Sequence, residues 1–333
     1  MWAVVVRAER GGMPLHRKLL AAVAVLACLP YVGLKVLWLA GSDVGLNDPS
    51  VLNSTSMTVA NAATLLMELS AAALAVLLVL PVGRRIPAGI VQVPMFVGTG
   101  LLGTILLVVP VQLVLAPAAA GSDGSSSDEG PIQGWVFAMV YAGFSVLGIC
   151  LLTIFVLHSW ERWVRPGGWI TPMGRWGSLP SRRRVLSIGH GLALVGVTVA
   201  ELVLMVRADL FGEIQAVFVL LAVAACAGLT ALALRAPFGR RGTAPLVLAY
   251  VGSAGVAAWG LYLAVVLTIP NPLNDDIDVP SGLVVVALLR GIAGALVPLA
   301  LHRLRPGATA PQAAEAQQPG ISTARPETHT VAS

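Results

Sequence analysis

Four charged residues lie inside otherwise apolar segments of this chain, and they are its best candidates for binding a charged solute. They are Lys35, Glu68, Glu201 and Arg290. An ionised side chain inside a bilayer costs about 2.5–3.5 kcal/mol on insertion scales, so it persists where it pairs, becomes neutral or lines an aqueous cavity. Two interpretations follow. The four residues form a polar substrate or ion site, or they form ion pairs that only hold helices together.

Depth along the apolar segments predicts how these residues would pair. Glu68 and Arg290 lie near the middle of their segments. Lys35 and Glu201 lie roughly 8–9 Å closer to the outer face, at 1.5 Å per helical residue. We therefore expect the pairs Lys35–Glu201 and Glu68–Arg290, in preference to a hairpin pair between Lys35 and Glu68. Such pairs place the site between the two halves of the chain.

The elements that carry these residues are apolar segments of membrane-spanning length. The 333 residues are 57% hydrophobic and 11% charged, with a mean hydropathy of +0.85. These values exclude a soluble protein and predict an all-α integral membrane protein with eight transmembrane helices. The first is expected to be an uncleaved span rather than a signal peptide. The predicted spans are Leu19–Leu39, Thr58–Leu80, Ile90–Leu115, Trp135–His158, Val185–Val206, Ile214–Leu234, Ala244–Ile269 and Leu283–Leu301.

Charge in the loops predicts the orientation of these spans. All Lys and Arg residues between spans, except Arg207, fall on one side when the loops are taken as alternating sides. By the positive-inside rule that side is cytoplasmic, so both termini are expected there. The predicted order is a cytoplasmic segment 1–18, helices 1–4 in 19–158, a cytoplasmic loop 159–184, helices 5–8 in 185–304, and a disordered tail 305–333.

The loop 159–184 is rich in Trp and Arg and contains half of the chain's eight Trp. Trp rings favour the headgroup layer of a bilayer, and Arg binds anionic headgroups. The interfacial residues predicted from this loop are Trp160, Arg162, Trp163, Arg165, Trp169 and Trp176. Topology anchoring without specific lipid binding is the alternative interpretation.

Short matches in the same order suggest that the two halves are related. The turn Pro81-Val-Gly-Arg-Arg recurs as Pro237-Phe-Gly-Arg-Arg, and Phe96-Val-Gly-Thr recurs as Tyr250-Val-Gly-Ser. Each match falls at the equivalent place in its half. The pattern predicts two parallel four-helix repeats related by an axis along the membrane normal, because four helices return the chain to its starting side.

No residue pattern predicts catalysis or a cofactor. His158 and His302 lie at the cytoplasmic rim, and His190 has no counterpart with which to hold a haem. The three Cys are widely separated within apolar segments. We expect no catalytic residues, no metal, no cofactor and no nucleic-acid partner, and therefore not an enzyme. Arg far outnumbers Lys, which is typical of a GC-rich genome and favours a bacterial cytoplasmic (inner) membrane.

These features predict an integral membrane protein that is permease-like or binds a small molecule or ion at a polar site between its halves. The lipid bilayer is its expected partner. The alternative is a non-catalytic scaffold or accessory subunit in which the intramembrane charges are structural ion pairs.

Overall fold

The fold was determined as a computed structural model, which describes residues 14–119, 130–164, 180–208, 210, 214–234, 243–269, 279–280 and 282–303. Within these ranges the chain is helical and has no strand. Eight of the described helices are long and apolar enough to cross a membrane. The prediction of an eight-span helical membrane protein is therefore confirmed at this level.

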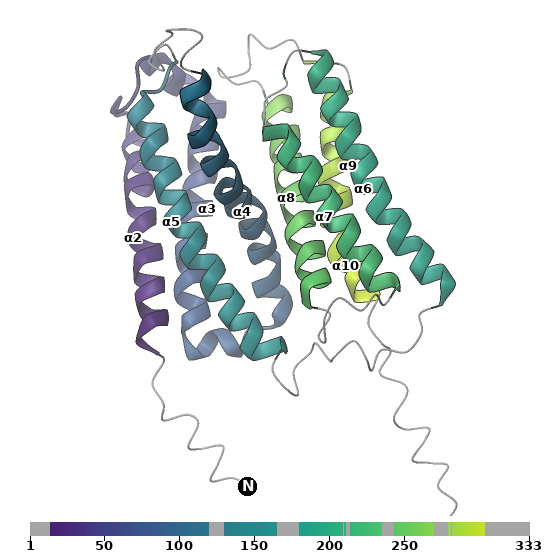
Figure 1. The fold of residues 1–333 in the computed structure, drawn as a ribbon. Helices are drawn as coiled ribbons and strands as arrows, with labels where there is room; N and C mark the ends of the chain where they lie inside the picture. The colour runs from purple at the N-terminus through teal and green to yellow at the C-terminus, as the bar shows by residue number, and fades with distance from the viewer. Residues whose placement is uncertain are drawn as a thin grey trace, which may run out of the picture.

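The first four spans form one bundle (Figure 1). Its helices are α2 (Leu15–Leu39), α3 (Thr55–Val79), α4 (Ala88–Ala119) and α5 (Gly134–Ser159). Helix α2 packs against α3 and α5, and α4 packs against α5. Small and apolar side chains, among them Ala24, Ala75, Met95 and Leu147, form its core. The helix α2 begins before the predicted span, since His16, Arg17 and Lys18 continue its helical backbone.

The last four spans form the second bundle, which has its own core around Leu194, Ala225 and Val256. Its helices are α6 (Ser181–Arg207), α7 (Ile214–Leu234), α8 (Thr243–Thr268), and the pair α9 (Leu283–Ala295) and α10 (Val297–Arg303). The eighth span is divided at Leu296. Pro298 explains the division, because its ring nitrogen cannot donate the helical hydrogen bond to the preceding turn.

Helices α4 and α8 join the two bundles (Figure 1). Gly100 lets their backbones approach, since a methyl group there would overlap the carbonyl oxygen of Ala254. One turn earlier, the rings of Phe96 and Tyr250 meet edge to face, with 5.3 Å between their centroids. Small residues at such crossings let the two helix backbones pack closely, because no large side chain separates them.

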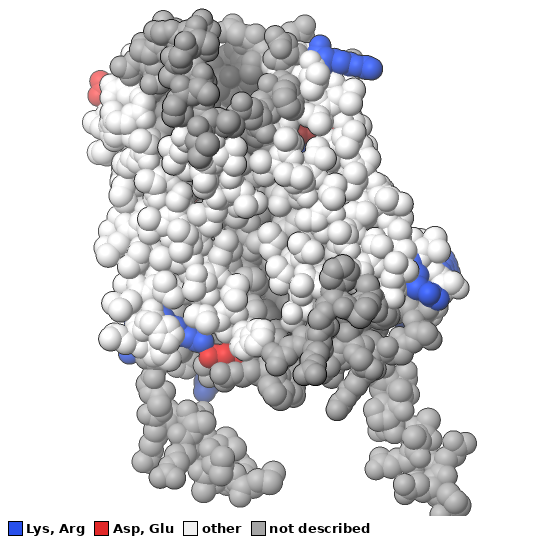
Figure 2. All heavy atoms as spheres, viewed as in Figure 1, with Lys and Arg blue, Asp and Glu red and all other residues white. Residues whose placement is uncertain are grey.

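Charged side chains gather at the two ends of the molecule (Figure 2). Arg17, Lys18 and the Arg182–Arg184 run lie at the end where the chain begins, and Arg207 ends α6 at the opposite end. Arg17 and Glu161 form a two-pronged ion pair there, at 3.0 and 2.5 Å, which ties α2 to the turn after α5. This distribution supplies the basic end that the positive-inside rule requires.

Candidate functional site

The four intramembrane charges separate into two groups, one in each bundle. In the second bundle, Arg290 Nε of α9 lies 2.8 Å from Glu201 Oε2 of α6. Both residues are 1% exposed. The predicted pairs Lys35–Glu201 and Glu68–Arg290 are therefore wrong, and so is the expectation that pairs connect the two halves.

The position of the interface between the halves explains this error. The prediction required α2 and α6 to face each other, whereas α4 and α8 form the contact. Glu201 instead faces Arg290 because α6 and α9 run antiparallel as neighbours. Glu201 and Arg290 lie roughly 9 and 10.5 Å from the helix ends opposite the basic one, at 1.5 Å per residue.

The surroundings of the Glu201–Arg290 pair are apolar. The Arg290 guanidinium lies over the Phe218 ring, 4.7 Å from its centroid. The contact is an ion pair by distance, while the Nε–H bond of Arg290 is not aligned on the carboxylate. Because the pair is buried and has a cation–π contact, it connects α6, α7 and α9 structurally and does not form an open binding site.

Lys35 has a different environment in the first bundle. Its Nζ donates a 2.7 Å hydrogen bond to Asn61 Oδ1 of α3. It also lies over the rings of Tyr31 and Trp38, at 5.0 and 4.6 Å from their centroids. No carboxylate in the described part of the chain pairs with Lys35. A buried lysine, 8% exposed, is thus held by a neutral amide and two aromatic faces.

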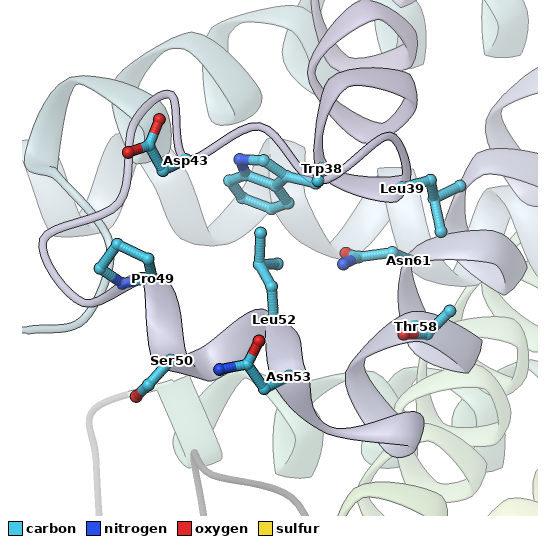
Figure 3. Close-up of a pocket in the computed structure, with 10 residues that line it drawn as sticks. Trp38, Leu39, Asp43, Pro49, Ser50, Leu52, Asn53, Thr58 and Asn61 are labelled. Atoms are coloured by element: carbon cyan, nitrogen blue, oxygen red, sulfur yellow. The ribbon is translucent and has the colours of Figure 1, made fainter.

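A cavity of about 400 Å³ lies near this lysine, between the α2–α3 connection and the adjoining ends of the two helices (Figure 3). This is the end of the bundle opposite the basic end. Two of the three residues in contact with Lys35, Asn61 and Trp38, line the cavity. The side chains of Trp38, Leu52 and Asn61 converge on the cavity, whereas the Asp43 carboxylate and the Ser50 hydroxyl point away (Figure 3). The remaining lining residues are Leu39, Gly41, Pro49, Asn53 and Thr58.

The connection between α2 and α3 supplies most of the residues that line this cavity. Its 3-10 turn η1 (Pro49–Asn53) is capped by Asp48, whose carboxylate accepts from the Ser50 backbone N–H at 2.9 Å. Hydrogen bonds from the Ser50 side chain and backbone lower the pKa of Asp48, so the cap remains ionised. The Trp38 indole N–H donates to the Val44 carbonyl at 2.8 Å, which fixes the ring at the cavity wall.

Contacts with the start of α5 fix the other side of this loop. The Asn47 N–H donates to the Pro131 carbonyl, and the Gln133 N–H donates to the Gly45 carbonyl. Gly45 has φ +80°, a left-handed conformation that costs glycine little. Hydrogen bonds therefore fix the α2–α3 loop that supplies most of the cavity lining.

Asn61 defines what the cavity can recognise. Because its Oδ1 accepts from Lys35, its NH₂ group is left to face the cavity, and that group has no partner among the described residues. A solute with a carboxylate or another acceptor would meet a donor amide with a lysine directly behind it. Mixed apolar walls with a few placed polar groups are typical of small-molecule sites.

Glu68 lies deeper in the same bundle and does not join the Lys35 contact. It is 6% exposed, and its neighbour across the α2–α3 interface is the Cys28 thiol. Its Oε1 has no hydrogen-bond partner among the described residues. Neither the predicted pair with Arg290 nor the rival hairpin pair with Lys35 is formed.

The predicted interfacial residues are only partly within the described ranges. Trp160 and Arg162 lie in the π-helical turn η3 (Trp160–Val164) that extends α5, and the backbone of Trp163 follows the same turn. Arg162 donates to the carbonyls of Gly83 and Ile86. Arg165, Trp169 and Trp176 lie outside the described residues, so headgroup binding stays a prediction.

The comparisons with known proteins identify no relative. The chain matches no protein-family model and no curated protein sequence, and its fold matches no solved structure. The fold by itself places the chain in the class of multi-span helical membrane proteins.

Proposed function

We propose that this protein is a permease-like or solute-binding protein of a bacterial cytoplasmic membrane, and that it binds a small anionic solute in the cavity near Lys35. The observation that carries this proposal is the Lys35–Asn61 contact. A buried lysine that has no carboxylate partner among the described residues contacts the Asn61 amide, which lines the cavity and has its NH₂ donor without a partner there. An intramembrane lysine held this way favours a negatively charged ligand, which would complete its pairing.

The site is then in the first bundle and not between the halves. A cavity of about 400 Å³ accommodates a small metabolite, since ligand pockets commonly measure ~300–1,000 Å³. The solute class that fits is a small carboxylate. Its anionic group would accept from Asn61, and its carbon atoms would contact Trp38 and Leu52.

The second bundle favours a structural role in the same protein. Glu201 and Arg290 are buried and paired, as the scaffold alternative requires. A scaffold or accessory subunit is therefore the second candidate function, and it predicts no solute binding in the first bundle.

We also propose that the bundles are parallel repeats with both termini cytoplasmic. Aligning Phe96 with Tyr250 aligns Gly100 with Ala254, and both equivalent pairs are in contact at the α4–α8 interface. Contacts between equivalent positions, repeated one turn apart, favour a two-fold relation between parallel helices. Superposition of α2–α5 on α6–α10 in an experimental structure tests this proposal. We expect the two bundles to superpose by a rotation of about 180° around an axis along the membrane normal.

The function is tested by the thermal stability of purified full-length protein with succinate, glutamate, glucose or choline. Succinate or glutamate should stabilise the wild type, by about 2.7 kcal/mol at one hundred times its Kd. Asn61→Leu and Lys35→Met should abolish the effect. Thr55→Val, at an exposed position at the same end that does not line the cavity, should retain it. Equal stabilisation of wild type and Asn61→Leu, or stabilisation by choline alone, contradicts the proposal.

A further inference from the structure

A row of polar side chains continues from the cavity into the first bundle, along the interface between α2 and α3. The cavity is lined by Asn61, whose partner is Lys35. One turn deeper, Thr64 of α3 lies beside the Tyr31 hydroxyl of α2. Below them, Glu68 faces Cys28. Residue numbers rise along α2 as they fall along α3, as an antiparallel pair requires.

The spacing shows that these residues share one face of each helix. On α3, Asn61, Thr64 and Glu68 are three and four residues apart, and such neighbours lie along one side of a helix. The single hydroxyl hydrogen of Thr64 is shared between the backbone carbonyls of Ala60 and Asn61, so the Thr64 oxygen can accept from the Tyr31 hydroxyl. Polar groups therefore continue through about two helical turns of an otherwise apolar interface.

Glu68 ends this row as a carboxyl group without a cation. It is more than nine-tenths buried. Among the described residues its Oε1 has no hydrogen-bond partner, and no Lys or Arg forms an ion pair with it. The titratable groups facing it are Cys28 and Tyr31 of α2. From α5, which also packs against α3, the described residues contribute none. Neither neighbour can supply a stable positive charge.

We infer that Glu68 is a proton-binding site that exchanges its proton with water at the cavity end of the bundle. Burying a carboxyl group without a cation costs far less free energy when the group is the neutral acid than when it is the anion. In the neutral form the carboxyl carries the proton; in the anionic form that proton has passed along the α2–α3 interface to water. The inference uses the cavity as an aqueous entrance and does not require that a solute binds there.

Glu201 is the matched control within the same chain. It is a glutamate of similar burial, 1% against 6% exposed, but it is paired with Arg290. The adjacent guanidinium favours the anionic form of Glu201, and Glu68 has no such neighbour among the described residues. The two carboxyls should therefore differ in any reaction that needs the neutral acid.

Dicyclohexylcarbodiimide provides such a reaction. A neutral carboxyl gives its proton to a carbodiimide nitrogen while the carboxylate oxygen adds to the central carbon, and the adduct rearranges to an N-acylurea without losing an atom. Full-length protein in membrane vesicles is treated with this reagent, and the adduct is located by peptide mass spectrometry. We expect an adduct on Glu68 at least about tenfold more abundant than on Glu201. Above its midpoint, formation should slow by about tenfold per pH unit.

The side from which the proton comes is tested with right-side-out and inverted vesicles, with a different pH on each side. An impermeant maleimide on D43C identifies the side that the cavity faces. Glu68 labelling should follow the pH on that side in both vesicle types, and Glu68→Gln should lose the adduct. Equal labelling of Glu68 and Glu201, labelling of Glu68 that ignores pH, or control by the pH of the opposite side overturns the inference. These outcomes do not depend on whether succinate or glutamate binds.

Discussion

Removing one partner of the Glu201–Arg290 pair should destabilise the protein strongly. At 2.8 Å, and at an effective dielectric constant of 20, the two charges attract by ~6 kcal/mol before desolvation is subtracted. Arg290 also gains about 0.5–2 kcal/mol over the Phe218 ring. Either Glu201→Leu or Arg290→Met leaves a buried charge without its partner. Each should therefore reduce the free energy of unfolding by about 3–5 kcal/mol.

The double variant separates pairing from burial. Glu201→Leu with Arg290→Met removes both charges, so its loss should be at least ~2 kcal/mol smaller than the sum of the single losses. The assay is reversible unfolding of the full-length protein in mixed micelles of increasing SDS content. As a control, Glu68→Leu combined with Arg290→Met should be additive within about 0.5 kcal/mol, because those residues are in different bundles. Additive losses for Glu201 and Arg290, or coupling in the control cycle, would refute the assigned pair.

Two further predictions concern helix contacts. Gly100→Ala should destabilise by about 1–3 kcal/mol, because its methyl group would overlap Ala254. As a control, Gly98→Ala should be neutral or stabilising by up to ~1 kcal/mol, because nothing lies within 4 Å of the added methyl group. Equal changes in the free energy of unfolding for Gly100→Ala and Gly98→Ala, in the same assay, would contradict the α4–α8 crossing. At the basic end, Arg17→Met should cost no more than about 1 kcal/mol, because its partner Glu161 is 27% exposed; a loss of 3 kcal/mol or more would mean that this pair behaves as buried.

The helices were predictable because their signal is local. A run of about twenty apolar residues needs no knowledge of the rest of the fold, since the bilayer thickness sets its length. The same applies to the Arg182–Arg184 run, because clustered Arg favours the cytoplasmic side of a membrane; Arg207, at the opposite end, is the exception. The divided eighth span was less obvious, although Pro298 marks it.

The contacts between helices were not predictable from depth alone. Depth gives the positions of Glu201 and Arg290 along the membrane normal. Which side chains meet is decided by the rotation of each helix about its own axis and by which helices are neighbours. The sequence does not encode that order locally, and it depends on close crossings such as the one at Gly100. Lys35 was identified as unusual while its partner Asn61 was missed, because an uncharged amide attracts little notice in a count of charges. The available signal for Asn61 was that it lies seven residues before Glu68, because that spacing puts the two polar side chains on one face of the same helix.

The cavity could not have been read from the sequence. It depends on the α2–α3 loop folding back onto the start of α5, and those backbone hydrogen bonds leave no residue pattern. The cap formed by Asp48 and Ser50 is a recognisable local signal, but it indicates a turn and not a pocket.

The most direct test of the central claim locates the solute by protection from maleimide. Cysteines are introduced separately at Asn53, which lines the cavity, and at Thr55, which is exposed at the same end and does not line it. Labelling of each variant by an impermeant maleimide is timed with and without saturating succinate or glutamate. Solute binding in the cavity predicts that at least one of these anions slows labelling at N53C several-fold and leaves T55C unchanged. Unchanged labelling at N53C with both anions, or equal slowing at both positions, would contradict solute binding at this site.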